Sequence, residues 1–230
     1  MTVAELKDYF KKELSETYTM SEIHELFSVF SEKFLGFNKL ALRNQAETQV
    51  QTEQINQFQK AVAELKTSKP FQQILGETEF FAMKFFVNEH VLIPRPETEE
   101  LLELALQKLN DVTSILDIGT GSGIIPVILK KHFPAAEITA LDISAEALKI
   151  ATKNAAFHQT EINFVFMDFL KDKPAKIFDV IISNPPYIGQ DEEGEIAASV
   201  KDFEPLKALF SPSDDALVFY RHIAEFAKTN

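Results

Sequence analysis

Residues 114–123 read Ser-Ile-Leu-Asp-Ile-Gly-Thr-Gly-Ser-Gly, and this stretch decides the fold. Its apolar half predicts a short buried strand, and its glycine-rich half predicts a sharp turn of the backbone. Further along the chain, strand-like runs alternate with helix-like segments, the strands at 137–143, 162–168 and 178–183 and the helices at 124–132 and 145–157. Strands that alternate with helices indicate an α/β fold with a parallel, doubly wound sheet.

The N-terminal third of the chain has a different pattern. Residues 1–75 carry apolar side chains at helical spacing, which predicts a small all-helical N-terminal domain of five helices without catalytic residues. The second of these helices is expected to begin at Ser21, which Glu22 and Glu25 follow. Gly36 is expected to end that helix.

A connector and a loop precede the α/β region. Residues 76–93 contain two apolar runs on either side of Asn88-Glu89, so we predict a β-hairpin linker that turns there. A stiff loop, Pro94-Arg95-Pro96-Glu97-Thr98, follows, and Thr98 is expected to start the next helix. The third domain then spans residues 94–230.

The composition narrows the function. The 230 residues include no cysteine, which excludes disulfides, thiolate metal sites and cysteine nucleophiles, and the five histidines show no ligand spacing, so we expect no metal. The net charge of -12 disfavours nucleic acid as a direct partner. Most of this charge lies beyond residue 75, which suits a basic protein partner. No segment has the character of a signal peptide or membrane span, so we expect a cytoplasmic protein without a membrane partner.

The glycine-rich turn is a candidate nucleotide-type site, made of Gly119, Thr120, Gly121, Ser122 and Gly123. It follows a parallel strand, and α/β sheets bind ligands at that edge. The spacing G-x-G-x-G differs from the G-x-G-x-x-G of nicotinamide cofactors. Asp142 ends the next strand, where its carboxylate could bind both hydroxyls of a ribose. Alternatively, Asp142 caps the following helix.

Three further residues complete the predicted cofactor site. Asp168 and Phe169 end the third strand, where they could meet the amine and the ring of an adenine, although a loop acid and a core Phe are the simpler interpretation. Asp117, beneath the turn, could orient backbone amides or bind the ammonium group of an amino-acid cofactor. S-adenosylmethionine carries a ribose, an adenine and an ammonium group, so it matches the three acids.

The fourth strand ends in Asn184-Pro185-Pro186-Tyr187, the strongest signal in the chain. Methylation of a planar amide or amino nitrogen requires two acceptors that hold the NH2 group and aim the nitrogen at the methyl group. The side-chain oxygen of Asn184 and the carbonyl of Pro185 can supply them, and neither proline adds a competing N–H. Tyr187 can stack on the flat amide. Catalysis is then mostly positioning and needs no metal.

Together these motifs resemble the bacterial release-factor N5-glutamine methyltransferases, the PrmC/HemK family. The similarity extends from about Gln73 onward and includes Val91–Glu99, Asp117–Gly123, Asn184–Tyr187 and Phe203-Glu204-Pro205. It implies a Rossmann-like S-adenosylmethionine-dependent methyltransferase domain with a helical N-terminal domain. It also implies methyl transfer to the glutamine of the Gly-Gly-Gln motif in class-1 peptide chain release factors, with S-adenosylhomocysteine as the product.

The resemblance assigns roles to parts of the chain. The helical domain is implied to dock the release factor, and Asn184 is implied to contact both the cofactor and the glutamine amide. Pro185, Pro186 and Tyr187 are expected to bind the substrate, together with Arg95, Glu97 and Thr98 of the loop. An acidic second domain suits a partner that also contacts ribosomal RNA.

Two departures from the family and two rival functions complete the predictions. Residues 211–217, Ser-Pro-Ser-Asp-Asp-Ala-Leu, differ from the family's glycine-rich loop, and the family continues beyond residue 230 with further strands, so we expect a C-terminally truncated domain. The nearest rival enzyme is a DNA adenine N6-methyltransferase, which the acidic charge disfavours. The other rival is a cofactor-binding module made inactive by truncation.

Overall fold

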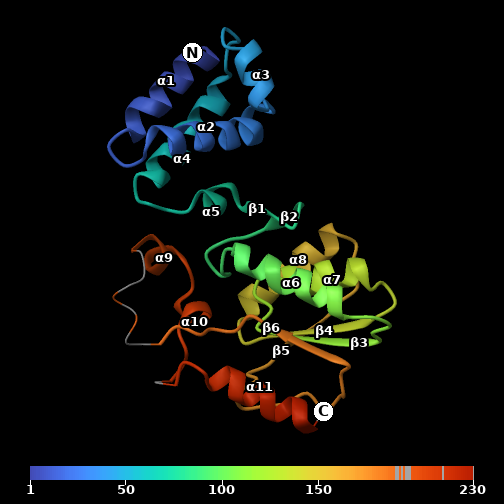
Figure 1. The fold of residues 1–230 in the computed structure, drawn as a ribbon. Coiled ribbons are helices and arrows are strands. Elements are labelled where there is room, and N and C mark those ends of the chain that lie inside the picture. Colours follow the sequence, from blue (N-terminus) through green and yellow to red (C-terminus); the bar gives the residue numbers. More distant parts are fainter. Residues whose placement is uncertain (190–191, 193, 195–197, 214, 230) are drawn as a thin grey trace. The chain divides into compact units, whose positions relative to one another are not determined.

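The computed structural model describes residues 1–189, 192, 194, 198–213 and 215–229, so parts of the predicted 94–230 domain lie outside it. It divides into two compact units, Met1–Leu75 and Gly76–Asn230 (Figure 1). The first unit is all-helical, as predicted, with α1 (Val3–Leu14), α2 (Met20–Leu35), α3 (Lys39–Asn44), α4 (Thr52–Leu65) and α5 (Phe71–Leu75).

Capping residues determine where α2 begins and ends. The hydroxyl of Thr19 accepts the N–H of Glu22 at 3.4 Å, and the Glu22 carboxylate accepts the N–H of Thr19 at 2.7 Å. This reciprocal capping box starts the helix at Met20, so the prediction of Ser21 as the start is wrong. Gly36 ends α2 in the left-handed region, with φ 72°, which confirms the predicted end.

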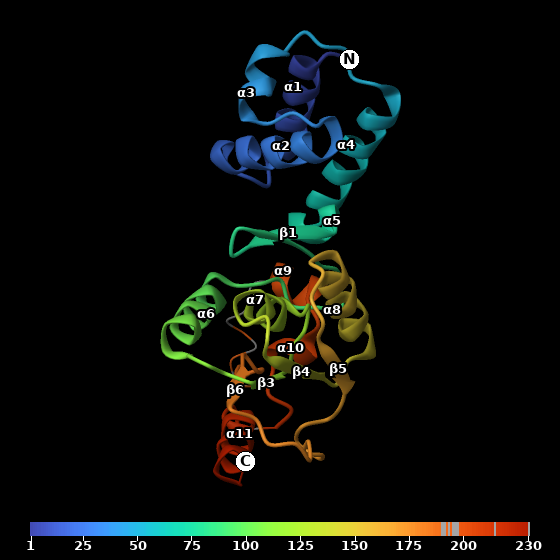
Figure 2. The ribbon, with the colours of Figure 1, turned by 90° about the vertical axis from the view of Figure 1, so that its right-hand side faces the viewer.

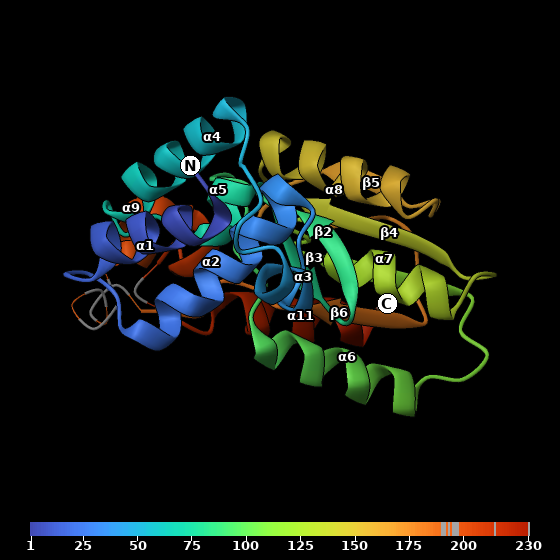
Figure 3. The same cartoon turned by 90° about the horizontal axis from the view of Figure 1, so that it is seen from above.

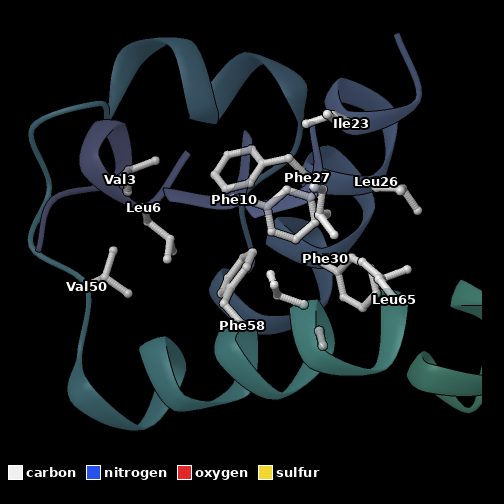
Figure 4. Packing of buried hydrophobic residues seen from close by; sticks show 13 residues of the cluster. Val3, Leu6, Phe10, Ile23, Leu26, Phe27, Phe30, Val50, Phe58 and Leu65 are labelled. Carbon is white, nitrogen blue, oxygen red and sulfur yellow. The ribbon is translucent and has the colours of Figure 1, made fainter. Parts of the chain in front are cut away.

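Phenylalanine side chains form the centre of the first unit (Figure 4). Phe10 from α1 contacts Phe27 from α2 edge to face, with ring centroids 5.5 Å apart, and Phe58 from α4 at 6.1 Å. Each of these rings is buried. Helices of this length are only marginally stable in isolation. The large apolar area that the aromatic rings bury between α1, α2 and α4 stabilises the three helices together.

The second unit opens with a hairpin whose turn was predicted in the wrong place. Strands β1 (Glu77–Phe80) and β2 (Met83–Phe86) pair antiparallel, and the turn falls at Phe81 and Ala82, both at φ 53°. Neither residue favours this left-handed conformation, so tertiary contacts hold it. The Glu99 carboxylate accepts the N–H of Phe81 at 2.7 Å, and Phe80 is buried next to the turn.

Asn154 ties the hairpin to the rest of the second unit. This fully buried side chain on α8 (Ala145–Phe157) accepts the N–H of Phe86 at 2.7 Å and donates to the Phe86 carbonyl at 3.0 Å. It also donates to the carbonyl of Ser122 at 2.8 Å, so one amide joins the hairpin to the glycine-rich turn.

Asn154→Ala is expected to lower the free energy of unfolding by about 3 kcal/mol, because the backbone groups of Phe86 and Ser122 lose their partner inside the protein. Urea denaturation followed by circular dichroism measures the change. The matched control is Asn163→Ala, since Asn163 is an exposed residue of β5 (Asn163–Phe166). Equal unfolding midpoints for the two variants would show that the Asn154 bonds add nothing to stability.

The four-stranded sheet is parallel and has the order β5-β4-β3-β6, with β3 (Ser114–Ile118), β4 (Glu137–Asp142) and β6 (Val180–Ser183) beside β5. Helices α6 (Pro96–Lys108), α7 (Ile124–His132) and α8 cover one face side by side, and α11 (Val218–Thr229) covers the other (Figures 1, 2 and 3). Ile115 and Leu116 of β3 belong to opposite cores, one on each face. This confirms the predicted doubly wound sheet.

The register of the strands brings the functional motifs to one edge. Ile118, at the end of β3, lies opposite Leu141 of β4 and Ser183 of β6. The residues that follow these three positions are Gly119, Asp142 and Asn184. Asp142 is the last residue of β4, so all three lie together at the carboxyl edge of the sheet. Two short helices, α9 (Ala198–Phe203) and α10 (Leu206–Leu209), follow in the chain.

Candidate functional site

A cavity of about 350 Å³ lies at the carboxyl edge of the sheet. Most of the predicted site residues line it: Arg95, Thr98, Gly119, Thr120, Gly121, Ser122, Asp142, Asp168, Phe169, Asn184, Pro185 and Pro186. Asp117, Gly123, Glu97 and Tyr187 are not among its lining residues. The structure therefore brings the glycine-rich turn and the Asn-Pro-Pro motif to the same hollow, although they lie about sixty residues apart in sequence.

Backbone hydrogen bonds shape the glycine-rich turn. The N–H groups of Gly119 and Thr120 both donate to the carbonyl of Leu141, each at 2.9 Å. Gly121, with φ 55°, donates its N–H to the Asp142 carboxylate at 2.8 Å. Gly121 has open space where a Cβ would stand, so a ligand can approach its backbone closely.

Asp142 is held in place by two amides. Its second oxygen accepts the N–H of Ser144 at 2.8 Å, and each oxygen keeps a lone pair for a ligand. Burial raises the pKa of Asp142, and hydrogen bonds from Ser144 and Gly121 partly offset this shift. The alternative role as a helix cap is wrong, because Ser144 caps α8 by accepting the N–H of Ala147 at 3.2 Å.

Asp117 lies beneath the turn and is completely buried. Among the described residues, neither of its carboxylate oxygens has a hydrogen-bond partner, so it does not orient the turn amides as one interpretation predicted. Burial raises its pKa to about 7; the nearby hydroxyl of Thr120 opposes the rise, and the charge of Asp142 adds to it. A buried carboxylate without partners suits a site that receives a cationic ligand.

Asp168 and Phe169 line the cavity, and both also make contacts with other residues of the protein. Asp168 forms an ion pair with Lys171 at 2.8 Å, and this hydrogen bond lowers its pKa. Phe169 is only 4% exposed and packs edge to face on Phe226, with ring centroids 5.6 Å apart. The predicted contacts with adenine stay a proposal, since both residues also serve the protein itself.

Asn184 is held in place in two ways, by a hydrogen bond of the preceding residue, Ser183, and by a hydrogen bond of its own side chain. The hydroxyl of Ser183 donates to the carbonyl of Ile118 at 2.6 Å, which locks the end of β6 to β3. The side-chain nitrogen of Asn184 donates to the hydroxyl oxygen of Thr98 at 3.0 Å. Asn184 lines the cavity, and among the described residues its side-chain oxygen Oδ1 has no hydrogen bond of this kind, so Oδ1 can act as an acceptor.

Tyr187 is 56% exposed and lies near Tyr220, whose pKa is raised by burial and by Tyr187. The chain after it is held by the divergent segment 211–217, of which Asp214 lies outside the described residues. The N–H of Ser211 donates to the carbonyl of Ile188 at 2.9 Å. The loop that departs from the family pattern therefore supports the segment next to Tyr187.

Arg95 is engaged by a buried acid. Glu204 has a side chain only 1% exposed; one oxygen accepts from Arg95 Nη2 at 2.6 Å, and the other accepts the N–H of Ile93 at 3.0 Å. The predicted stiff loop is also shorter than expected. Helix α6 begins at Pro96 rather than Thr98, because Pro is favoured at the first helical position.

Several functional candidates were missed at the sequence level. Glu204 belongs to the segment Phe203-Glu204-Pro205 of the family resemblance, but nothing local marks it as the partner of Arg95. Lys207 and Phe219 line the cavity from segments far along the chain. Ile143 lines the cavity and is 50% exposed, and its apolar side chain beside Asp142 was the one local signal that could have revealed it.

Two further searches cover the part of the chain that the structure describes. Within it, no group of three or more His, Asp or Glu residues could hold a metal ion. No helix within it combines the length and apolarity needed to cross a bilayer.

Comparison with known proteins places this site in a family. A model described as the PrmC N-terminal domain matches residues 5–76, and one described as the methyltransferase small domain matches residues 97–202. Both matches agree with the two units of the structure, one helical and one α/β.

Curated relatives match nearly the whole chain. A release factor glutamine methyltransferase of Flavobacterium psychrophilum is 39% identical over 236 residues, which cover 100% of this chain and 83% of that protein. The proteins of the same name from Streptococcus pneumoniae and Bacteroides thetaiotaomicron are 41% and 36% identical and cover 99% and 96% of this chain, with 80% of each relative matched. The chain therefore belongs to the release factor glutamine methyltransferase family.

Proposed function

We propose that this protein transfers a methyl group from S-adenosylmethionine to the side-chain amide nitrogen, N5, of the glutamine in the Gly-Gly-Gln motif of class-1 peptide chain release factors. The observation that carries the proposal is the position of Asn184. Asn184 lines the same cavity as the glycine-rich turn and Asp142, and its bond to Thr98 engages the side-chain nitrogen rather than the oxygen. The names of the matched relatives support the same substrate.

The residues at the cavity fit S-adenosylmethionine. Gly121 offers a backbone that a ligand can approach, and Asp142 offers two oxygens to ribose hydroxyls. The carboxyl group of Asp117 lies behind the turn without a hydrogen-bond partner among the described residues, and in its ionised form its negative charge favours a ligand with an ammonium group. A cavity of about 350 Å³ falls within the size range of small-molecule sites.

The chain's own residues supply positioning and hydrogen bonding. An amide nitrogen is a weak nucleophile because its lone pair is delocalised into the carbonyl. Asn184 Oδ1 and the carbonyl of Pro185 would accept the two N–H groups of the glutamine and hold its nitrogen in line with the methyl group. S-adenosylmethionine supplies that methyl group on a sulfonium. The glutamine nitrogen would form a bond to the methyl carbon as the carbon–sulfur bond of the sulfonium breaks, and it would release one proton to water, with S-adenosylhomocysteine as the second product.

The first unit has a role of its own in this proposal. We assign residues 1–75 to docking of the release factor, because residues 5–76 match the family's N-terminal domain. A second hollow, within this unit, is lined by Lys7, Lys11, Lys39 and Arg43 together with Asp8 and Glu25, and Lys39 is ion-paired with Glu25 at 2.8 Å. These cations can contact acidic side chains of a protein partner. Because release factors act on ribosomes, we place the reaction in the cytoplasm, with no membrane and no nucleic acid as direct partner.

Peptide mass spectrometry tests the proposed function. The full chain is incubated with S-adenosylmethionine, an unmodified release factor and competitor DNA, and methylated sites are mapped. One methyl group on the Gly-Gly-Gln glutamine is expected. Asn184→Ala should lower kcat by about 10²- to 10³-fold at saturating cofactor, as loss of one well-placed hydrogen-bonding group does elsewhere. Asn163→Ala, a change at an exposed position outside the cavity lining, should leave kcat unchanged.

Each other product has a defined meaning. If methyl groups were found only on DNA adenine, the substrate would be DNA rather than the release factor. Tight cofactor binding without methylation of either substrate would indicate a binding module.

A further inference from the structure

We infer that Thr98 is a positioning residue for methyl transfer: its buried hydroxyl holds the Asn184 side-chain amide by its nitrogen, so that the amide oxygen faces the substrate. This inference rests on the proposed function and gives Thr98 a different role from the direct substrate contact that the sequence suggested. The observation behind it is the 3.0 Å bond from Asn184 Nδ2 to Thr98 Oγ1.

The need for such a bond follows from the chemistry of asparagine. Its side-chain amide has two ends of nearly equal shape, of which one accepts and the other donates hydrogen bonds. A half-turn about the last side-chain bond exchanges them. The glutamine NH2 group is a donor, so only the oxygen-inward arrangement of Asn184 can hold it. A threonine hydroxyl can accept a hydrogen bond from the amide nitrogen. The bond in the structure runs from Asn184 Nδ2 to Thr98 Oγ1, and this is the arrangement that leaves the amide oxygen free for the glutamine.

Thr98 is itself rigidly placed. It is 5% exposed and lies in the first turn of α6, where its N–H donates to the carbonyl of Arg95 at 2.9 Å. The start of this helix is held by the buried Glu204, which binds both Arg95 and the N–H of Ile93. A β-branched side chain also has restricted rotation about its first bond. The hydroxyl therefore occupies a defined position before any substrate arrives.

Asn184 is equally constrained from the other side. The Ser183 hydroxyl and the pairing of β6 with β3 fix the backbone just before it. With both partners held by separate elements, the amide orientation is set in advance, and substrate binding does not have to supply the energy of ordering it. Loss of the Thr98 hydroxyl should thus affect the catalytic step more than binding.

Thr98→Val removes the hydroxyl at nearly constant shape, and Thr98→Ser retains it. We expect Thr98→Val to lower kcat by about 10²-fold, the effect of misplacing a catalytic group by about 1 Å. KM for the release factor and Kd for S-adenosylmethionine should each change by less than about threefold, which is a small change on the tenfold scale of binding free energies. Thr98→Ser should retain near wild-type kcat. Thr98→Ala provides a second hydroxyl-free variant if Val at this position lowers the melting temperature.

A double-mutant cycle with Asn184→Ala separates positioning from a general structural effect. If Thr98 acts through Asn184, the variant Thr98→Val/Asn184→Ala should have the same kcat as Asn184→Ala alone. Multiplication of the two single losses would overturn the inference, as would wild-type kcat in both hydroxyl-free variants.

A spectroscopic measurement keeps the inference apart from the proposed function. The side-chain NH2 signals of Asn184 in ¹⁵N-labelled protein are assigned by their absence in Asn184→Ala. Thr98→Val should shift these signals and Thr98→Ser should not. Unchanged signals in Thr98→Val would refute the hydrogen bond even if the wild-type protein methylates its substrate. A wild-type protein that methylates nothing, with the expected shift, would instead count against the proposed function alone.

Discussion

Asp117→Asn is expected to change the pH dependence of stability, so that the variant gains about 4 kcal/mol relative to the wild type between pH 4 and pH 8. The carboxyl group of Asp117 is buried without a hydrogen-bond partner among the described residues, and its pKa rises from 3.8 to about 7. The folded protein therefore binds this proton more tightly than the unfolded chain does. Wild-type stability is full below about pH 4, falls through the window up to pH 7, and stays at the lower level above it.

Denaturant unfolding at a series of pH values measures this effect without ligand. The quantity to compare is the slope of the free energy of unfolding against pH. Burial of the new amide costs the same at every pH, so it does not affect this slope. Asp179→Asn is the matched control. Hydrogen bonds from Thr113 and Ser114 lower the pKa of Asp179 to about 2, so its contribution is present above pH 4 and is lost only in more acidic solution. From pH 5 to 8, Asp179→Asn should show the wild-type slope. If Asp117→Asn also showed the wild-type slope, the raised pKa of Asp117 would be contradicted.

Gly123→Ala is expected to destabilise the second unit by about 2–5 kcal/mol, combining left-handed backbone strain with overpacking. Gly123 has φ 78° and begins α7 against α8. A Cβ there would lie 2.9 Å from both the Cα and the Cβ of Ala151, and one of those atoms belongs to the backbone, which cannot move aside easily. Thermal melting followed by circular dichroism measures the loss.

Gly121→Ala is the contrasting variant. Gly121 also has a positive φ, 55°, but its Cβ would meet nothing within 4 Å. This variant should lose only about 1–2 kcal/mol from strain. It should nevertheless bind S-adenosylmethionine much more weakly, because Gly121 lines the cavity and the new methyl group would occupy the space of the ligand. Equal melting temperatures for the two variants would argue against the clash with Ala151.

The accuracy of the sequence-based predictions depends on how local their causes are. The helices at 124–132 and 145–157 coincide with α7 and α8, since apolar periodicity and a turn at each end are properties of neighbouring residues. The predicted start of α2 at Ser21 is wrong, because Thr19 and Ser21 are both acceptable caps and the structure uses Thr19. Only the reciprocal bonds between Thr19 and Glu22 distinguish them.

The hairpin shows where local patterns fail. Asn88-Glu89 has better turn residues than Phe81-Ala82, yet the chain turns at the second pair with both residues at φ 53°. Burial of Phe80 and Phe85, together with the bonds from Glu99 and Asn154, outweighs the turn preference. Such long-range contacts cannot be read from the two strands themselves.

The sequence by itself determined the doubly wound sheet, the glycine-rich turn and the placing of Asp142 and Asn184 at strand ends, because strand alternation and turn chemistry are encoded within a few residues. Only the tertiary structure decided which side chains hold these groups. The Thr98 hydroxyl meets Asn184 across 86 residues of sequence, and Glu204 meets Arg95 across 109. The depth at which Asp117 is buried likewise depends on elements packed from both faces of the sheet. Orientation and pKa arise from these contacts between distant residues, so no local pattern could specify them.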